Sequence, residues 1–343
     1  MRSAIDLHHT SYSSIYLPIA KPTMNDSETS QRFKAPTPGV WAPAVTLFNH
    51  ETDTLDIPSQ KKYYSYLSQT GLTGLVILGT NAETFLLTRE ERAQLLVAAR
   101  SSVPADYPLM AGVGGHSTKQ VLEYISDAHA ARANYVLVLP PAYFGKQTTN
   151  KVIERFFDDV AEASPLPIVI YNFPGVCNGV DMDSELMTKL ARKHENIVGV
   201  KLTCASVGKI TRLAATFPLS RFAVFGGQSD FLLGGMAVGS AGCIAAFGNV
   251  APKTLAKIYE LWEQGDRGEA LRLHQVAALA ENPCKAGIAA VKYAASLYSA
   301  AQAGIEGAEQ KMWPRQPYEP LDEAAKKKIS QGISEVLEIE KGL

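Results

Sequence analysis

The chain of 343 residues carries 33 Lys and Arg against 34 Asp and Glu, a net charge of −1, and 46% of its residues are hydrophobic. This balance predicts a folded protein with a large core, and it argues against nucleic-acid binding through a basic surface. No apolar run approaches the ~20 residues of a membrane-spanning helix, so no membrane partner is expected. Four widely spaced cysteines, Cys177, Cys204, Cys243 and Cys284, form no metal-binding pattern and predict reduced thiols.

The first segment, residues 1–38, is rich in Ser, Thr and Pro and lacks helical periodicity. Such a composition predicts a disordered tail before the folded part. A mitochondrial transit peptide is Arg-rich and poor in acids, whereas this segment contains Asp6, Asp26 and Glu28. We therefore predict a cytoplasmic location, with mitochondrial import as the alternative.

From Gly39 onward, eight short apolar segments alternate with longer amphipathic ones. Their length and β-branched content predict strands buried on both faces, as in a parallel sheet, at residues 40–48, 72–78, 109–113, 135–139, 168–171, 197–202, 222–225 and 243–247. Eight such units predict a (β/α)8 barrel, or TIM barrel, over residues 39–264. An open doubly wound sheet is the alternative, but it would favour a Gly-x-Gly-x-x-Gly fingerprint after the first strand, and that is missing.

Helix-start signals support the alternation. Thr88 and Ser117 each precede a Glu or Gln by three positions, the spacing of a capping box. Asp181 and Asp183 are N-cap candidates for a helix over residues 184–192. Three further helical patterns follow the eighth unit and predict a C-terminal helical extension over residues 265–343, near 268–279, 285–303 and 321–337.

Lys201 ends an apolar run that begins at Ile197, and the nearest ionisable residues in sequence are Glu195 and Lys209. Burial disfavours the charged ammonium form, which leaves more free amine to attack a carbonyl. The alternative is a lysine at a strand end that extends its amine to water. Because the active sites of (β/α)8 barrels lie at the carboxyl ends of the strands, the predicted fold makes Lys201 the candidate nucleophile.

Other polar residues follow neighbouring strands at the same predicted edge. Thr80 and Asn81 carry hydroxyl and N–H groups that suit a carboxylate, although a turn that caps the next helix is the alternative. Tyr171 is a candidate proton shuttle, with a packed aromatic as the alternative. Tyr143 follows the fourth strand and has the same alternative, and Gly227 follows the seventh strand. Together these residues suit Schiff-base chemistry on a ketone.

Phosphate-loop and metal chemistry are both disfavoured. The glycines of residues 112–115 are not followed by Gly-Lys-Ser/Thr, so a tight turn is favoured there. None of the seven histidines lies in an HExxH or similar pattern. We therefore expect no metal and no cofactor, and a small 2-oxo acid as the binding partner.

Three motifs, in family order, resemble the dihydrodipicolinate synthase / N-acetylneuraminate lyase family of pyruvate-handling class I aldolases. Residues 79–83 match Gly-Ser/Thr-Thr/Asn-Gly-Glu, residues 171–174 match Tyr-Asn-x-Pro, and residues 199–201 match Gly-x-Lys. The resemblance implies that Lys201 forms the Schiff base and that Tyr171 shuttles protons. It also implies that Thr80 joins a hydroxyl relay and that Thr80 and Asn81 bind the pyruvate carboxylate.

Tyr143 matches a tyrosine that, in many members of the family, reaches across a tight dimer to complete the relay. The resemblance also implies a homotetramer, built as a dimer of dimers and supported by the C-terminal helices.

Departures from the family pattern bear on the substrate. Dihydrodipicolinate synthases usually carry Arg where this chain has Val176, so a clamp for a carboxylated aldehyde is absent. Asn81 replaces a Thr and resembles 4-hydroxy-2-oxoglutarate and 2-keto-3-deoxy sugar acid aldolases, while Ala82 replaces a Gly. We expect a lyase that cleaves a 2-keto-3-deoxy sugar acid to pyruvate and an aldehyde. The alternatives are 4-hydroxy-2-oxoglutarate cleavage, a synthase-type condensation, and a silent barrel that senses a 2-oxo acid.

Overall fold

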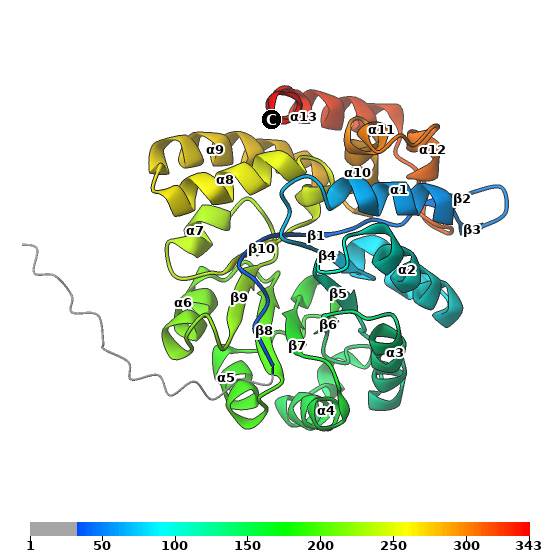
Figure 1. Ribbon diagram of the computed structural model, residues 1–343. Coiled ribbons are helices and arrows are strands. Elements are labelled where there is room, and N and C mark those ends of the chain that lie inside the picture. Colours follow the sequence, from blue (N-terminus) through cyan, green and yellow to red (C-terminus); the bar gives the residue numbers. More distant parts are fainter. Residues whose placement is uncertain (1–32) are drawn as a thin grey trace, which may run out of the picture. The chain divides into compact units, whose positions relative to one another are not determined.

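A computed structural model describes residues 33–343 of the chain. Eight parallel strands close into a barrel in the order β1-β10-β9-β8-β7-β6-β5-β4, as Figure 1 shows. This closed parallel barrel confirms the predicted (β/α)8 fold, and its strands are β1 Gly39–Pro43, β4 Gly74–Ile77, β5 Leu109–Gly112, β6 Tyr135–Val138, β7 Ile168–Asn172, β8 Ile197–Leu202, β9 Ala223–Gly226 and β10 Gly242–Ile244.

The strands are joined by helices that surround the barrel (Figure 1): α1 Ile57–Leu67, α2 Arg89–Ser102, α3 Thr118–Ala130, α4 Asn150–Ala163, α5 Ser184–Lys193, α6 Val207–Thr216, α7 Leu232–Met236 and α8 Pro252–Gln264. Thr88 forms the expected capping box, since its Oγ1 accepts from the Glu91 N–H and its own N–H donates to the Glu91 carboxylate. Ser117 caps α3. Of the two candidates before α5, Asp183 is the N-cap.

The first predicted strand is wrong at its carboxyl end, because β1 stops at Pro43 and not at Phe48. The Ala44 N–H still donates to Val76 of β4, but from Val45 onward buried N–H groups bond to side chains in place of a neighbouring strand. The Val45 N–H donates to Asn249 Oδ1 at 3.1 Å, and the Leu47 N–H donates to Gln60 Oε1 at 2.8 Å. Buried N–H groups must find acceptors, but these need not be strands. Phe48 instead begins a short hairpin of β2 Phe48–Asn49 and β3 Thr54–Leu55.

Two separate apolar clusters show which strand residues face inward. One lies between the barrel and its helices and includes Val200 and Leu202. The other fills the barrel and includes Trp41, Tyr171 and Phe225. Successive residues of a strand point to opposite faces, and in β7 Ile168 and Ile170 belong to the first cluster while Val169 and Tyr171 belong to the second.

The chain continues beyond α8 into a C-terminal helical extension, of which α9 and α13 pack on each other and on α8 (Figure 1). Its helices are α9 Arg267–Cys284, α10 Ile288–Ser296, α11 Ser299–Gln302, α12 Ala308–Lys311 and α13 Glu323–Gly342. The predicted pattern over residues 285–303 is broken rather than continuous, because Tyr298, with φ −142°, leaves the helical conformation between α10 and α11. Gly287, whose φ of 146° residues with a side chain rarely adopt, separates α9 from α10. Glu340 of α13 accepts from Lys253 and Thr254 and so caps the start of α8.

The predicted tail, residues 1–38, falls largely outside the described residues, and the domain boundary after residue 264 stays a prediction. Within residues 33–343 no helix is both long and apolar enough to cross a membrane.

Candidate active site

Lys201 lies on the interior face of the barrel, near the carboxyl end of β8. It is level with Tyr171 on β7 and with Phe225 on β9 in the strand register, and both neighbours belong to the cluster that fills the barrel. Only 2% of Lys201 is exposed. The structure therefore places Lys201 inside the barrel rather than extended to water, which disfavours the alternative of an exposed strand-end lysine.

The Lys201 amine lies over the ring of Tyr171. Its Nζ lies 4.3 Å from the centre of the Tyr171 ring. No hydrogen bond or ion pair joins it to another residue in the part of the chain that the structure describes. An unpaired amine beside a phenol can add to a carbonyl and exchange protons with the neighbouring hydroxyl.

The turn after β4 offers hydrogen-bond donors to an anion. The segment Thr80–Ala82 forms one 3₁₀ turn in which the N–H groups of Ala82 and Glu83 donate to the carbonyl oxygens of Gly79 and Thr80, each at 3.0 Å. Among the described residues the N–H groups of Thr80 and Asn81 have no acceptor. The Thr80 hydroxyl is likewise buried without a partner. Buried donors normally have partners, so this turn suits a ligand carboxylate.

Glu83, at the end of this turn, is held by a charged network that sequence reasoning missed. Its Oε1 accepts from Lys292 Nζ at 2.7 Å, and its Oε2 accepts from the Arg315 N–H at 2.7 Å. Burial lowers the pKa of Lys292 to about 8, although the adjacent Glu83 acts to raise it. Both partners belong to the C-terminal extension, so the extension is joined directly to the candidate site.

Gly227 lies after β9, where the chain approaches Thr203 closely. A Cβ added to Gly227 would lie 2.0 Å from Thr203 Oγ1, so only glycine fits without a shift. The Thr203 hydroxyl is buried and has no hydrogen-bond partner within residues 33–343. Thr203 was not among the predicted site residues, although its position two residues after Lys201 indicated the same side of the strand.

Tyr143 is not joined to the other predicted residues within a single chain. It is 70% exposed. Its ring contacts His116 and Phe144, with ring centres 5.9 and 5.3 Å apart, and His116 stacks on Phe85. Three of these four aromatic residues, Tyr143, Phe144 and Phe85, are exposed apolar side chains, and such clusters commonly mark contact surfaces.

A cavity of about 550 Å³ lies beside the turn after β4. It is bounded by the barrel edge and by the extension, with Thr80, Thr84, Val176, Gly287, Tyr318 and Glu319 among its lining residues. None of the described residues that line it is Lys, Arg or His. Val176 is 43% exposed there. The cavity therefore offers no cationic side chain to the far end of a bound molecule.

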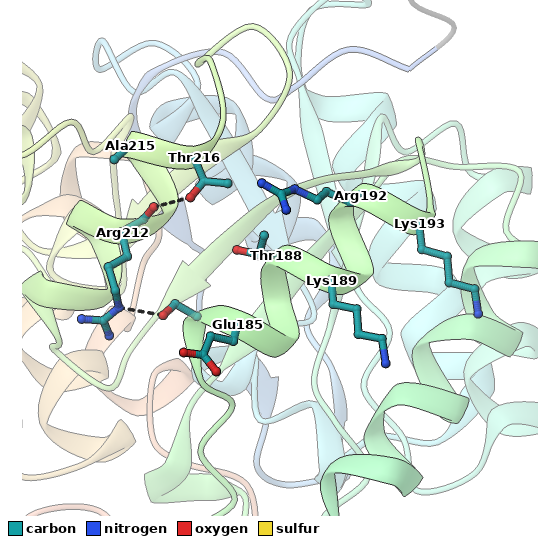
Figure 2. A pocket seen from close by; sticks show the side chains of 9 residues that line it. Glu185, Thr188, Lys189, Arg192, Lys193, Arg212, Ala215 and Thr216 are labelled. Carbon is teal, nitrogen blue, oxygen red and sulfur yellow. Dashed lines mark hydrogen bonds between the residues drawn. The ribbon is translucent and has the colours of Figure 1, made fainter.

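A larger hollow lies elsewhere, between α5 and α6 on the outside of the barrel. Figure 2 shows Lys189, Arg192, Lys193 and Arg212 around it. Lys189 and Lys193 are paired with Glu154 and Asp158, and Arg212 donates to Ser184 Oγ at 2.7 Å. This hollow contains none of the predicted site residues, and two of its four cations, Lys189 and Lys193, form local ion pairs.

Three of the four cysteines, Cys177, Cys243 and Cys284, are buried. All four are free thiols. Burial raises the pKa of Cys177 to about 11 and that of Cys284 to about 12. Burial also raises the pKa of Cys243. Within residues 33–343 no group of three or more His, Cys, Asp and Glu is placed to hold a metal ion.

A second contact joins the extension to the loop after β9. Glu281 of α9 accepts from the Ser229 hydroxyl at 2.7 Å and from its N–H at 3.3 Å. Burial raises the pKa of Glu281 above its usual 4.5. The two hydrogen bonds that Ser229 donates favour the ionised carboxylate and oppose this rise, but burial outweighs them.

Glu281→Gln provides a test of this burial. A raised pKa in the folded state adds stability below pH 4.5 that is lost as the pH rises through the folded-state value. Glutamine keeps the size and one acceptor oxygen for the Ser229 N–H, its amide group can donate to the Ser229 hydroxyl, and it does not titrate. The variant should therefore gain in Tm relative to the wild type as the pH is raised from about 4.5 towards 8. Melting curves across this range measure it, and a constant difference at all pH values would contradict the assignment.

The barrel, with a buried lysine at the carboxyl end of one strand and free donors at the end of another, defines a (β/α)8 enzyme with its site at that edge. The family model described as "Dihydrodipicolinate synthetase family" matches residues 36–336, and the chain belongs to this family. The motif resemblance is thereby confirmed.

Named relatives support the same class. A Coccidioides immitis protein named "Putative 4-hydroxy-2-oxoglutarate aldolase, mitochondrial" is 66% identical over 310 residues, which cover 90% of this chain and 99% of the relative. An L-threo-3-deoxy-hexylosonate aldolase of Hypocrea jecorina is 40% identical over 317 residues, which cover 89% of this chain and 98% of the relative. The chain is a carbon–carbon lyase of the aldolase type.

A solved structure agrees with the fold. The crystal structure of a dihydrodipicolinate synthase family protein from Coccidioides immitis superposes with a TM-score of 0.85 at 63% identity, and the match covers 90% of this chain and 98% of the other.

Proposed function

We propose that the protein cleaves a 2-oxo-4-hydroxy acid, preferably a 2-keto-3-deoxy sugar acid, to pyruvate and an aldehyde through a Schiff base on Lys201. The observation that carries the proposal is the unpaired Lys201 amine, buried inside the barrel beside Tyr171. A protein that only senses 2-oxo acids has no need for a buried, unpaired amine at the edge where barrel enzymes bind substrates.

In the proposed reaction the substrate carboxylate binds the free N–H groups of Thr80 and Asn81. The Lys201 amine adds to the C2 ketone, and loss of water gives an imine. In the dehydration Tyr171 donates its proton to the departing hydroxyl, which leaves a protonated imine and a tyrosinate. As the C3–C4 bond breaks, its electrons move to the iminium nitrogen and form a neutral enamine, while the tyrosinate takes the proton of the C4 hydroxyl. Protonation of the enamine at C3 and hydrolysis then release pyruvate and restore the free amine, with no net oxidation or reduction.

The cavity beside the turn supports a neutral, hydroxyl-bearing tail. Among its described lining residues Glu319 and Glu83 are the only charged ones, and neither is cationic. A carboxylated aldehyde would lie here without a charge-assisted partner, whereas sugar hydroxyl groups need none.

Val176→Arg should change this preference. An arginine in the cavity would pair with the carboxylate of an aldehyde such as aspartate semialdehyde, but it would leave an unpaired cation beside a sugar tail. We expect the carboxylated aldehyde to bind about ten- to a hundredfold more tightly and the sugar acid to bind more weakly. Val176→Leu serves as the control of similar size. Efficient use of aspartate semialdehyde by the wild type would contradict the proposed substrate preference.

4-Hydroxy-2-oxoglutarate is the second candidate substrate, because the 66% identical relative bears the name of that aldolase. The experiment that decides is pyruvate release, measured as kcat/KM, from a panel of 2-keto-3-deoxy acids and from 4-hydroxy-2-oxoglutarate. A higher value for a sugar acid supports the first candidate, and a higher value for 4-hydroxy-2-oxoglutarate supports the second. No pyruvate release from either class would contradict the proposed activity.

We also propose a homotetramer in which Tyr143 of one chain completes the site of a neighbouring chain. The exposed aromatic cluster of Tyr143, Phe144, Phe85 and His116 supports such a contact, and sedimentation equilibrium measures the assembly. For location we propose the cytoplasm, with mitochondria as the alternative that the name of the Coccidioides relative favours.

A further inference from the structure

One buried ion pair connects the C-terminal extension to the turn that offers free N–H groups. Lys292, on α10, donates from Nζ to Glu83 Oε1 at 2.7 Å, and the two side chains are 0% and 1% exposed. Lys292 also donates to the Trp313 carbonyl oxygen at 2.7 Å. Burying two charges is costly unless their geometry and remaining hydrogen bonds are satisfied, so this pair is fixed in one arrangement.

The second oxygen of Glu83 is fixed as well. It accepts from the Arg315 N–H at 2.7 Å. The Arg315 side chain is itself held, because it bonds to Asp53 at 3.0 Å and to Glu91 at 2.6 Å. Both carboxylate oxygens of Glu83 therefore bond to groups of the extension, one to a side chain and one to the backbone.

This anchoring has a consequence for the backbone of the turn. Glu83 adopts φ 58°, in the left-handed region that residues with a side chain rarely enter unless the surroundings impose it. In this conformation its N–H donates to the Thr80 carbonyl oxygen at 3.0 Å and closes the turn. The closed turn leaves the N–H groups of Thr80 and Asn81 without acceptors.

We propose that Lys292 and Glu83 are positioning residues for the carboxylate of the 2-oxo acid. They hold the turn closed, so that the N–H groups of Thr80 and Asn81 stay free for the carboxylate, and neither side chain binds the carboxylate itself. The inference rests on the proposed function, because it assumes that a 2-oxo acid binds at this turn.

Lys292→Met tests the inference, since methionine fills much of the lysine volume without its charge. The probe is pyruvate with borohydride, and the measured quantities are the pyruvate concentration that gives half-maximal trapping at Lys201 and the trapping rate at saturation. A misplaced binding group weakens binding strongly. We expect the half-saturating concentration to rise by about ten- to a hundredfold, with a smaller change in the saturated rate.

Glu83→Gln and the double variant complete the test. If the two residues act as one unit, the double variant should raise the half-saturating concentration by less than the product of the two single effects. Glu83→Gln keeps the volume of the side chain, and it should also raise the half-saturating pyruvate concentration. It therefore replaces Lys292→Met in the test if that variant does not fold. Lys326→Met is the matched control, because Lys326 also lies in the extension but pairs with Glu309 and Glu323, away from the turn. This control should match the wild type.

The outcomes separate the two proposals. An unchanged half-saturating concentration in Lys292→Met and Glu83→Gln, or a fall in the saturated rate alone, would overturn the positioning role. Absence of trapping in the wild-type protein would instead contradict the proposed Schiff-base function.

Discussion

Lys201→Arg is expected to abolish turnover while leaving the fold intact. The guanidinium group stays protonated under all working conditions and cannot add to a ketone. Loss of an essential nucleophile should lower kcat by at least about 10⁴-fold. Pyruvate release from the preferred substrate measures the effect, and circular dichroism with a melting curve shows whether the barrel is retained.

Lys285→Arg is the control for this substitution. Lys285 also lies beside a loop at the carboxyl edge, but it pairs with Asp230 and is more exposed than Lys201. It should keep near wild-type turnover. A folded Lys201→Arg protein with substantial activity would assign the reaction to another group.

Tyr171→Phe is expected to lower kcat by about 10²–10⁴-fold, the usual contribution of a general acid–base group. The ring and its packing inside the barrel are kept, and only the hydroxyl is lost. Trapping of pyruvate at Lys201 should become slower but remain measurable, because the amine is still present. A steady-state assay and a trapping time course together give both quantities.

A matched control is Tyr63→Phe, which removes a hydroxyl that bonds to Asn249 and lies in the cluster outside the barrel. Its kcat should stay close to that of the wild type even if its Tm falls. Equal kcat values in Tyr171→Phe and the wild type would return Tyr171 to a packing role.

The barrel and its strands could be predicted because hydrophobic periodicity reports burial directly. Each of the eight apolar runs overlaps a barrel strand, and the capping box at Thr88 marks the start of α2. The end of the first strand could not be predicted, since it depends on side chains of Asn249 and Gln60 that take over the backbone hydrogen bonds. Such long-range partners leave no local pattern in the sequence.

Some residues of the candidate site could likewise be predicted from the sequence, and others could not. Lys201 could be singled out because a lysine in an apolar run is unusual, and its predicted strand placed it at the active edge. Glu83 was noticed only as part of a motif, and Lys292 lay in a helical pattern where a lysine usually faces water. Their ion pair is a contact between distant segments, so neither residue alone carried a signal of burial.

The proposal that Lys201 forms a Schiff base is best tested by mass spectrometry of the protein after reaction with pyruvate and borohydride. We expect one covalent addition of reduced pyruvate, which peptide mapping locates on Lys201 and which is absent from Lys201→Arg. Addition at Lys209 or Lys292, or no addition while pyruvate is still released from the substrate, would contradict it.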